Sequence, residues 1–167
     1  MKTLRKVMKA FAATVLAFGI AATVQPATAG TGSSLSAIDS VIRSGGADAI
    51  ISELERAEDL YCVQCIDLVL PLLQDDDYRV REVAAWWVSK RPGLAQMITV
   101  ESVNTLRTGS TIDVRNAADA VGTFRHPQVI QALTDSLDRN ELGPEARLAA
   151  TRALGTIGHP MGAEAVE

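Results

Sequence analysis

Apolar residues recur at intervals of three and four along the chain beyond residue 29, and alternating runs of β-branched residues are few. This spacing is typical of amphipathic helices that bury one face, whereas half-buried strands alternate at every second residue. It predicts an all-α fold of short helices. The expected buried stripes are Ile50, Leu54, Ala57 and Tyr61; Cys62, Cys65, Ile66, Val69 and Leu73; Val80, Val83, Ala84, Trp87 and Val88; Leu94, Met97 and Ile98; Val114, Ala117, Ala118 and Val121; Val129, Ile130, Leu133 and Leu137; and Ala146, Ala149, Ala150, Ala153, Leu154 and Ile157.

Residues typical of helix ends separate these stripes. Asp77 can cap the N-terminus of a helix that begins near Tyr78. Pro127 and Pro144 suit the first position of a helix, where the missing N–H costs no hydrogen bond. The glycine pair 45–46 suits a helix end, because glycine adopts the left-handed conformation readily.

One of these helices recurs along the chain. Residues 80–85, Val-Arg-Glu-Val-Ala-Ala, are echoed by Val-Arg-Asn-Ala-Ala at 114–118 and by Ala-Arg-Leu-Ala-Ala at 146–150. The corresponding arginines, Arg81, Arg115 and Arg147, are 34 and 32 residues apart. A period in the low thirties with two helices per unit predicts a helical solenoid.

The recurring segments resemble HEAT-like repeats, in particular the short form named after phycobilisome lyases. The pattern of that family runs roughly Asp-x-x-Val-Arg-x-x-Ala-Ala-x-x-Leu-Gly-x-x-Gly-x-Pro. Residues 77–92 match its beginning, residues 146–160 match its end, and the middle copy has Thr111 in place of the aspartate. The resemblance covers residues 61–167.

The resemblance implies a right-handed α-solenoid of antiparallel helix pairs. In the family an Asp–Arg ladder links the repeats, and Asp77 and Arg81 match that pattern here. We expect about three helix pairs in residues 61–160, preceded by one or two capping helices in residues 30–60. The residues from Pro160 onward align with the first helix of a further repeat, so we expect the last repeat of the 61–167 array to be incomplete.

The first 29 residues have the features of a secretory signal peptide. Residues 1–9 are basic, residues 10–24 are uncharged and mostly apolar, and Ala27-x-Ala29 is a small-x-small cleavage signal. The apolar run is shorter than the roughly 20 residues that span a bilayer. We expect cleavage, export to the periplasm or beyond the cell and no membrane span in the mature chain; an uncleaved N-terminal anchor is the alternative.

The charge of the chain changes once this segment is set apart. The full chain has 16 basic and 20 acidic side chains, and residues 1–29 hold four of the basic ones and no acid. The remaining 138 residues therefore carry 12 basic and 20 acidic groups, a net charge of −8. Such a chain repels phosphate backbones, which argues against nucleic acid as the main partner.

Cys62-Val-Gln-Cys65 is the most distinctive local motif. Residue 66 is isoleucine rather than histidine, which disfavours covalent haem attachment. In an exported protein a structural disulfide between Cys62 and Cys65 is the simplest interpretation. Buried free thiols, a redox-active pair and a metal or haem site are the alternatives.

Other candidates for chemistry have simpler explanations. His126 and His159 each precede a proline at a helix entry, where turn and capping roles account for them. The acid run at 75–77 lacks the alternating spacing and the closing glutamate of a calcium loop. We find no nucleophile elbow and no phosphate-binding glycine loop. We therefore predict no catalytic residues, no metal site and no cofactor.

The leading functional hypothesis is a non-catalytic scaffold that binds another protein or a peptide on a concave face. In the resembling family this face is lined by the second helix of each pair. The candidate partner-binding residues are Arg81, Ala85, Trp86, Arg115, Asp119 and Arg152. The alternative is an enzyme or enzyme subunit, either a lyase-like accessory factor, which export disfavours because bilin attachment is cytoplasmic in that family, or a thiol–disulfide helper that uses Cys62 and Cys65.

Overall fold

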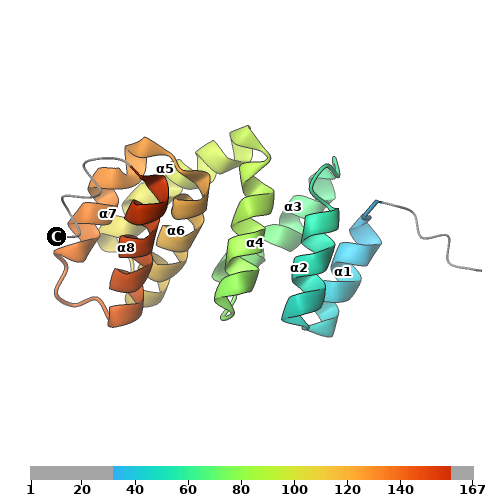
Figure 1. Cartoon of the computed structure of the whole chain (residues 1–167), viewed down its shortest axis with the longest axis horizontal. Helices are drawn as coiled ribbons and strands as arrows, with labels where there is room; N and C mark the ends of the chain where they lie inside the picture. Colours follow the sequence, from blue (N-terminus) through green and yellow to red (C-terminus); the bar gives the residue numbers. More distant parts are fainter. Residues whose placement is uncertain (1–31, 159–167) are drawn as a thin grey trace, which may run out of the picture.

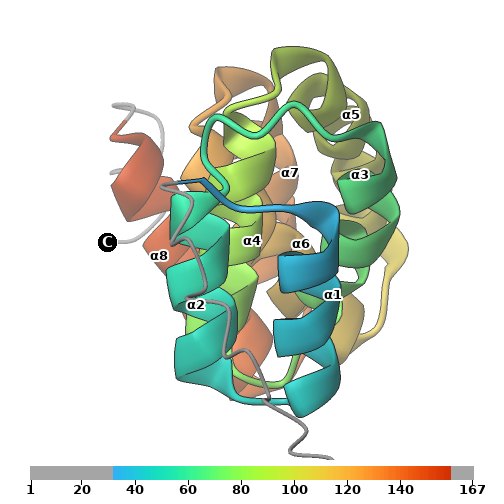
Figure 2. The same cartoon turned by 90° about the vertical axis from the view of Figure 1, so that its right-hand side faces the viewer.

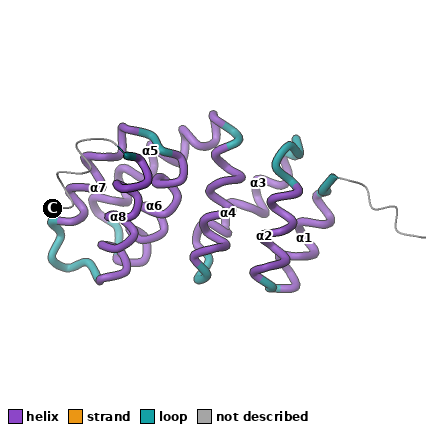
Figure 3. Tube along the Cα trace, viewed as in Figure 1, coloured by secondary structure: helices purple, strands orange, loops and turns teal. Residues whose placement is uncertain are grey.

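The computed structural model describes residues 32–158, and every regular element in that stretch is a helix (Figures 1 and 3). The predicted signal peptide, His159 and the predicted incomplete last repeat lie outside the described residues. The helices are α1 (Leu35–Ser44), α2 (Ala47–Arg56), α3 (Val63–Val69), the 3₁₀ helix η1 (Leu70–Gln74), α4 (Tyr78–Ser89), α5 (Pro92–Thr108), α6 (Thr111–Phe124), the 3₁₀ helix η2 (Pro127–Val129), α7 (Ile130–Leu137) and α8 (Pro144–Ile157).

The helix ends follow local chemistry that the sequence predicts. The Asp77 carboxylate caps α4 by accepting the backbone N–H of Arg79 at 2.8 Å. Pro144 is the first residue of α8. Gly45 and Gly158 end α1 and α8 with φ of 69° and 67°, a conformation that side chains with a Cβ rarely adopt.

The helices form two layers along an elongated molecule, with α1 at one end and α7 and α8 at the other (Figures 1 and 2). In one layer α2 contacts α4, α4 contacts α6, and α6 contacts α8. In the other layer α1 contacts α3 and α5 contacts α7. Contacts between α1 and α2, α4 and α5, and α7 and α8 join the two layers, so neighbours in sequence are neighbours in space.

The core of residues 32–158 consists of two hydrophobic clusters. The first extends from α1 to the beginning of α5, takes in Ala120 of α6, and includes Leu54 and Trp87, which have no exposed surface. The second lies mainly among α6, α7 and α8 and includes Leu133 and Leu154. Phe124 packs against both clusters, so the boundary between them lies at α6.

The contact between α6 and α8 depends on a small residue. A Cβ on Gly122 would lie 2.9 Å from both Cα and Cβ of Ala153. Real side chains do not approach so closely, so the two helices can pack at this distance only because Gly122 has no side chain.

Two residues of the expected buried stripes lie on the surface instead. Tyr61 is 95% exposed and Met97 is 56% exposed, so their predicted burial is wrong. Tyr61 lies in the loop after α2, which ends at Arg56, and the helical spacing does not continue that far. Met97 lies on the side of α5 that borders an open groove.

The longest helix of the described stretch, α5, has 17 residues and carries Glu101 and Arg107. At 1.5 Å per residue this helix is about 26 Å long. Within residues 32–158, we find no helix whose length and apolar character would suffice to cross a membrane.

Candidate functional site

Three of the predicted partner-binding residues are internal. Ala85 has no exposed surface, Arg81 is 4% exposed and Asp119 is 7% exposed. The Arg81 guanidinium on α4 donates to Asp119 Oδ2 on α6 from Nε at 3.0 Å and from Nη2 at 2.8 Å. The Arg81–Asp119 pair holds α4 against α6. Among the predicted partner-binding residues, Trp86, Arg115 and Arg152 are therefore the ones left with accessible surface.

Asp77 and Arg81, which match the Asp–Arg pattern of the resembling family, do not pair with each other in the structure. The carboxylate of Asp77 bonds to Arg79, and Arg81 instead pairs with Asp119, 38 residues further along the chain. Arg81 also donates from Nη1 to the carbonyl oxygens of Asp75 and Asp76 at 2.7 and 3.0 Å. One guanidinium therefore fixes the loop before α4 and the neighbouring helix at once.

Arg152 on α8 extends this network to the surface. Its Nη2 lies 3.7 Å from Asp119 Oδ1, and its guanidinium carbon lies 4.1 Å from the ring centroid of Tyr78. Burial raises the pKa of Tyr78, so the ring is a neutral phenol near neutral pH. About a third of the Arg152 side chain, 37%, stays accessible, and contact with a partner remains a prediction for it.

Trp86 and Arg115 are both half-buried. The Trp86 ring packs against the first hydrophobic cluster, and Lys90 Nζ lies 4.9 Å from its centroid. Arg115 Nε donates to Asn116 Oδ1 at 3.0 Å, and Asn116 Nδ2 donates in turn to Gln74 Oε1 at 2.6 Å. This chain of hydrogen bonds links α6 to η1.

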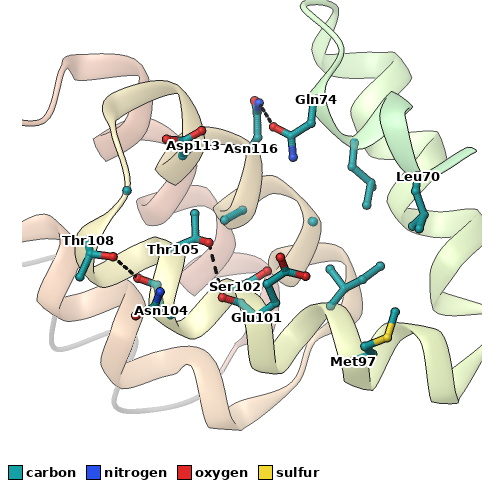
Figure 4. Close-up of a pocket in the computed structure, with 15 residues that line it drawn as sticks. Leu70, Gln74, Met97, Glu101, Ser102, Asn104, Thr105, Thr108, Asp113 and Asn116 are labelled. Carbon is teal, nitrogen blue, oxygen red and sulfur yellow. Dashed lines mark hydrogen bonds between the residues drawn. The ribbon is translucent and has the colours of Figure 1, made fainter.

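An open groove of about 420 Å³ lies between η1 and α5, with α6 as its floor (Figure 4). Leu73 and Gln74 form one wall, and Met97 and Glu101 form the other. Asn116 and Ala117 belong to the floor, and the Gln74–Asn116 hydrogen bond crosses one end.

The groove combines apolar side chains, such as Leu73 and Met97, with acidic and amide groups. Glu101 is exposed, and its carboxylate forms no ion pair with any residue in the described part of the chain. Asp113 also borders the groove, but its carboxylate is bound by the Ser110 hydroxyl, which lowers its pKa. Such a surface suits a partner segment that offers apolar side chains together with a basic group.

Ser102 is buried, and no histidine lines the groove. Among residues 32–158, no group of three or more His, Cys, Asp or Glu side chains is placed to hold a metal ion.

The motif at Cys62 and Cys65 forms a disulfide, with the two sulfurs 2.08 Å apart and the Cα atoms 5.2 Å apart. Cys62 is the residue that caps α3, and its Sγ accepts the backbone N–H of Cys65 at 3.1 Å. The simplest interpretation of the motif from sequence agrees with this pairing. A second depression, of about 430 Å³, lies beside Cys62.

Sequence reasoning missed the groove, although two signals for it exist. Pro71 falls inside the expected stripe from Cys62 to Leu73, and the structure changes there from α3 to the 3₁₀ helix η1. Met97 and Glu101, four residues apart, present an accessible face of α5. The space between them and η1 remains open because η1 packs on α4 and α6.

Known proteins offer no guide to these sites. No protein-family model matches the chain, and no curated protein or solved structure is significantly similar to it. What the molecule does must therefore be inferred from the geometry of its own residues.

Proposed function

We propose that the chain is an exported scaffold, non-catalytic at the groove between η1 and α5, and that this groove holds a segment of another protein. The observation that carries this proposal is the groove itself, with its apolar walls and the unpaired carboxylate of Glu101. The fold proposed to present it is a right-handed, HEAT-like α-solenoid in which α1 and α2 cap the array.

Two arginines support the stacking of repeated units. Arg91 donates to the carbonyl oxygen of Leu60, 31 residues earlier, at 2.8 Å. Arg139 donates to the carbonyl oxygens of Leu106 and Gly109, 33 and 30 residues earlier, at 3.1 and 2.9 Å. These separations are close to the sequence period of 32 to 34 residues, as expected if each unit bonds to the one before it.

A protein segment fits the groove better than a nucleic acid does. The chain without residues 1–29 has a net charge of −8, and Glu101 and Asp113 add local negative charge. Phosphate backbones would be repelled, whereas an amphipathic segment with a lysine or arginine would gain apolar contact and a charge partner. Walls formed by packed helices are already in place, which reduces the ordering cost of binding.

Export is part of the proposal, and one observation is compatible with it. Disulfides persist in oxidising compartments such as the periplasm and the extracellular space. The bond between Cys62 and Cys65 suits such a compartment, as does the signal peptide that the sequence predicts for residues 1–29.

Site-specific photo-crosslinking in the producing cell tests this function. A photoreactive residue at Met97, in the groove, should capture a defined partner protein. The matched control is Leu148 on α8, which is 63% exposed, compared with 56% for Met97, but lies outside the groove. The control should not capture that partner.

Reversal of the Glu101 charge tests whether this carboxylate contributes to binding of the captured partner. Glu101→Lys should reduce capture at Met97 by about tenfold, which corresponds to the loss of one favourable charge contact and the gain of a repulsive one. Glu55→Lys on α2, also exposed, should leave capture unchanged. Equal capture from Met97 and Leu148, or no capture from Met97, would contradict the proposed function.

A further inference from the structure

The two cysteines of the disulfide differ sharply in access. Cys65 has no exposed surface and belongs to the first hydrophobic cluster. Cys62 is partly exposed and lines the depression of about 430 Å³, whereas Cys65 does not line it. Of the two cysteines, Cys62 is therefore the one that an incoming thiolate can approach.

Exposed apolar side chains flank this accessible sulfur. Tyr61 is 95% exposed and Val63 is 62% exposed, and both line the depression next to Cys62. Pro92 and Leu94, at the beginning of α5, line it as well. A disulfide that only stabilises the fold has no need of an apolar surface beside its accessible sulfur, whereas one that exchanges with a protein substrate needs somewhere to hold that substrate.

We propose that Cys62 and Cys65 form a redox-active pair that oxidises a thiol pair in a protein segment held in this depression. The activity goes beyond the scaffold function and uses a different surface from the groove between η1 and α5. Its substrate class is an exported polypeptide with two reduced cysteines and apolar residues near them.

The exchange proceeds in two steps that balance. A substrate thiolate attacks Cys62 Sγ, the Cys62–Cys65 bond breaks, and the electron pair leaves on Cys65 Sγ, which takes a proton. The second substrate thiolate attacks the substrate sulfur of the mixed disulfide, and Cys62 leaves with the electron pair and is protonated. The substrate thiols thereby lose two electrons and two protons, which end on Cys62 and Cys65.

The surroundings of Cys62 favour its thiolate as the final leaving group. Its Sγ already accepts the N–H of Cys65 at 3.1 Å, and a hydrogen bond to the charged form stabilises it. Lys90 and Arg91 line the same depression, but their charges are used locally: Lys90 pairs with Glu58, and Arg91 donates to the carbonyl oxygens of Trp87 and Leu60.

A single-turnover assay tests the activity. The purified full chain with its disulfide intact is mixed with an equimolar reduced peptide that carries two cysteines flanked by apolar residues, and mass spectrometry follows both after acid quenching. We expect the peptide to lose two hydrogens and the protein to gain two under native conditions. A disulfide that reacts with the peptide only after the protein is denatured would overturn the proposal.

Single-cysteine variants locate the attack. Cys65→Ser leaves the accessible Cys62 thiol, and it should form a mixed disulfide with an activated peptide disulfide at least about tenfold faster than Cys62→Ser, whose remaining thiol is buried. Circular dichroism of both variants checks that each is folded. Equal rates in two folded variants would overturn the assignment of Cys62.

The ratio of the exchange rates with the peptide and with dithiothreitol tests whether the depression binds the substrate. Val63→Ser should slow exchange with the dithiol peptide several-fold and leave reduction by dithiothreitol unchanged, since that small dithiol needs no apolar contact. Ile112→Ser, at a side chain 57% exposed and outside the depression, is the matched control and should change neither rate. Equal peptide rates in the two variants would overturn the substrate site.

Discussion

Asp119 accepts two hydrogen bonds from the Arg81 guanidinium, and the pair joins α4 to α6 where the two hydrophobic clusters meet. The neighbour of Asp119 on one side, Ala118, belongs to the second cluster, and the neighbour on the other side, Ala120, belongs to the first. A buried pair between helices therefore lies at the joint between the two halves of the core.

Removal of one member of this pair should destabilise the protein strongly. Asp119→Ala leaves the Arg81 charge buried without its partner, which costs about 3–5 kcal/mol in the free energy of unfolding. Urea denaturation followed by circular dichroism measures this loss.

A matched surface pair serves as the control for Asp119→Ala. Arg107 on α5 and Asp135 on α7 also join two helices, at 3.5 Å, but their side chains are 51% and 41% exposed. Arg107→Ala should cost about 0–1 kcal/mol. Similar losses in the two variants would show that burial of the Arg81–Asp119 pair does not matter.

The same pair shows what the sequence could and could not predict. The helices and their ends follow from local features such as the spacing of apolar residues, the Asp77 cap and Pro144, so their prediction is confirmed. The partner of Arg81 depends on how α4 and α6 lie against each other, and no local spacing determines that contact. The groove at Met97 escaped prediction for the same reason, because it depends on the placement of η1 relative to α5.

Substitution of two glycines by alanine should change stability in opposite directions, because Gly122 lies where α6 and α8 are in close contact and Gly155 faces open space. Gly122→Ala places a Cβ 2.9 Å from Ala153 and should cost about 1–3 kcal/mol through overpacking. Gly155→Ala on α8 meets no atom within 4 Å and should stabilise the helix by about 0.5–1 kcal/mol. Thermal unfolding of both variants measures the difference, and a destabilised Gly155→Ala would contradict this account.

The adjacent tryptophans should differ in their contribution to stability. Trp87 has no exposed surface, and its Nε1 donates to the carbonyl oxygen of Ala57 at 3.0 Å. Trp87→Ala should cost about 3–5 kcal/mol. Trp86→Ala should cost clearly less, because part of that ring already faces solvent. Denaturant titration of the two variants compares them, and equal losses would assign Trp86 to the core.

Acid should weaken the cap of α4. The hydrogen bond and charge of Arg79 hold the pKa of Asp77 below its ordinary value of 3.8. Because the folded state lowers this pKa, the contribution of Asp77 to stability is present above about pH 4 and is lost as the pH falls through the folded-state value.

Asp77→Asn tests this pH dependence directly. Asparagine caps helices about as well as aspartate, so the variant should resemble the native chain at pH 7. Between pH 5 and pH 3 the variant should lose less stability than the native chain, as measured by urea denaturation at each pH. The same loss in both proteins would remove Asp77 as a source of the acid sensitivity.

The backbone bonds of Arg91 and Arg139 have a consequence for the order in which the molecule can form. Each arginine follows a helix, α4 or α7, and binds carbonyl oxygens of a segment made about 30 residues earlier. The loops closed in this way are similar in length, so each closure carries a similar entropic cost. A chain emerging from its N-terminus can therefore complete one contact after another without waiting for its end, and such local contacts favour fast folding.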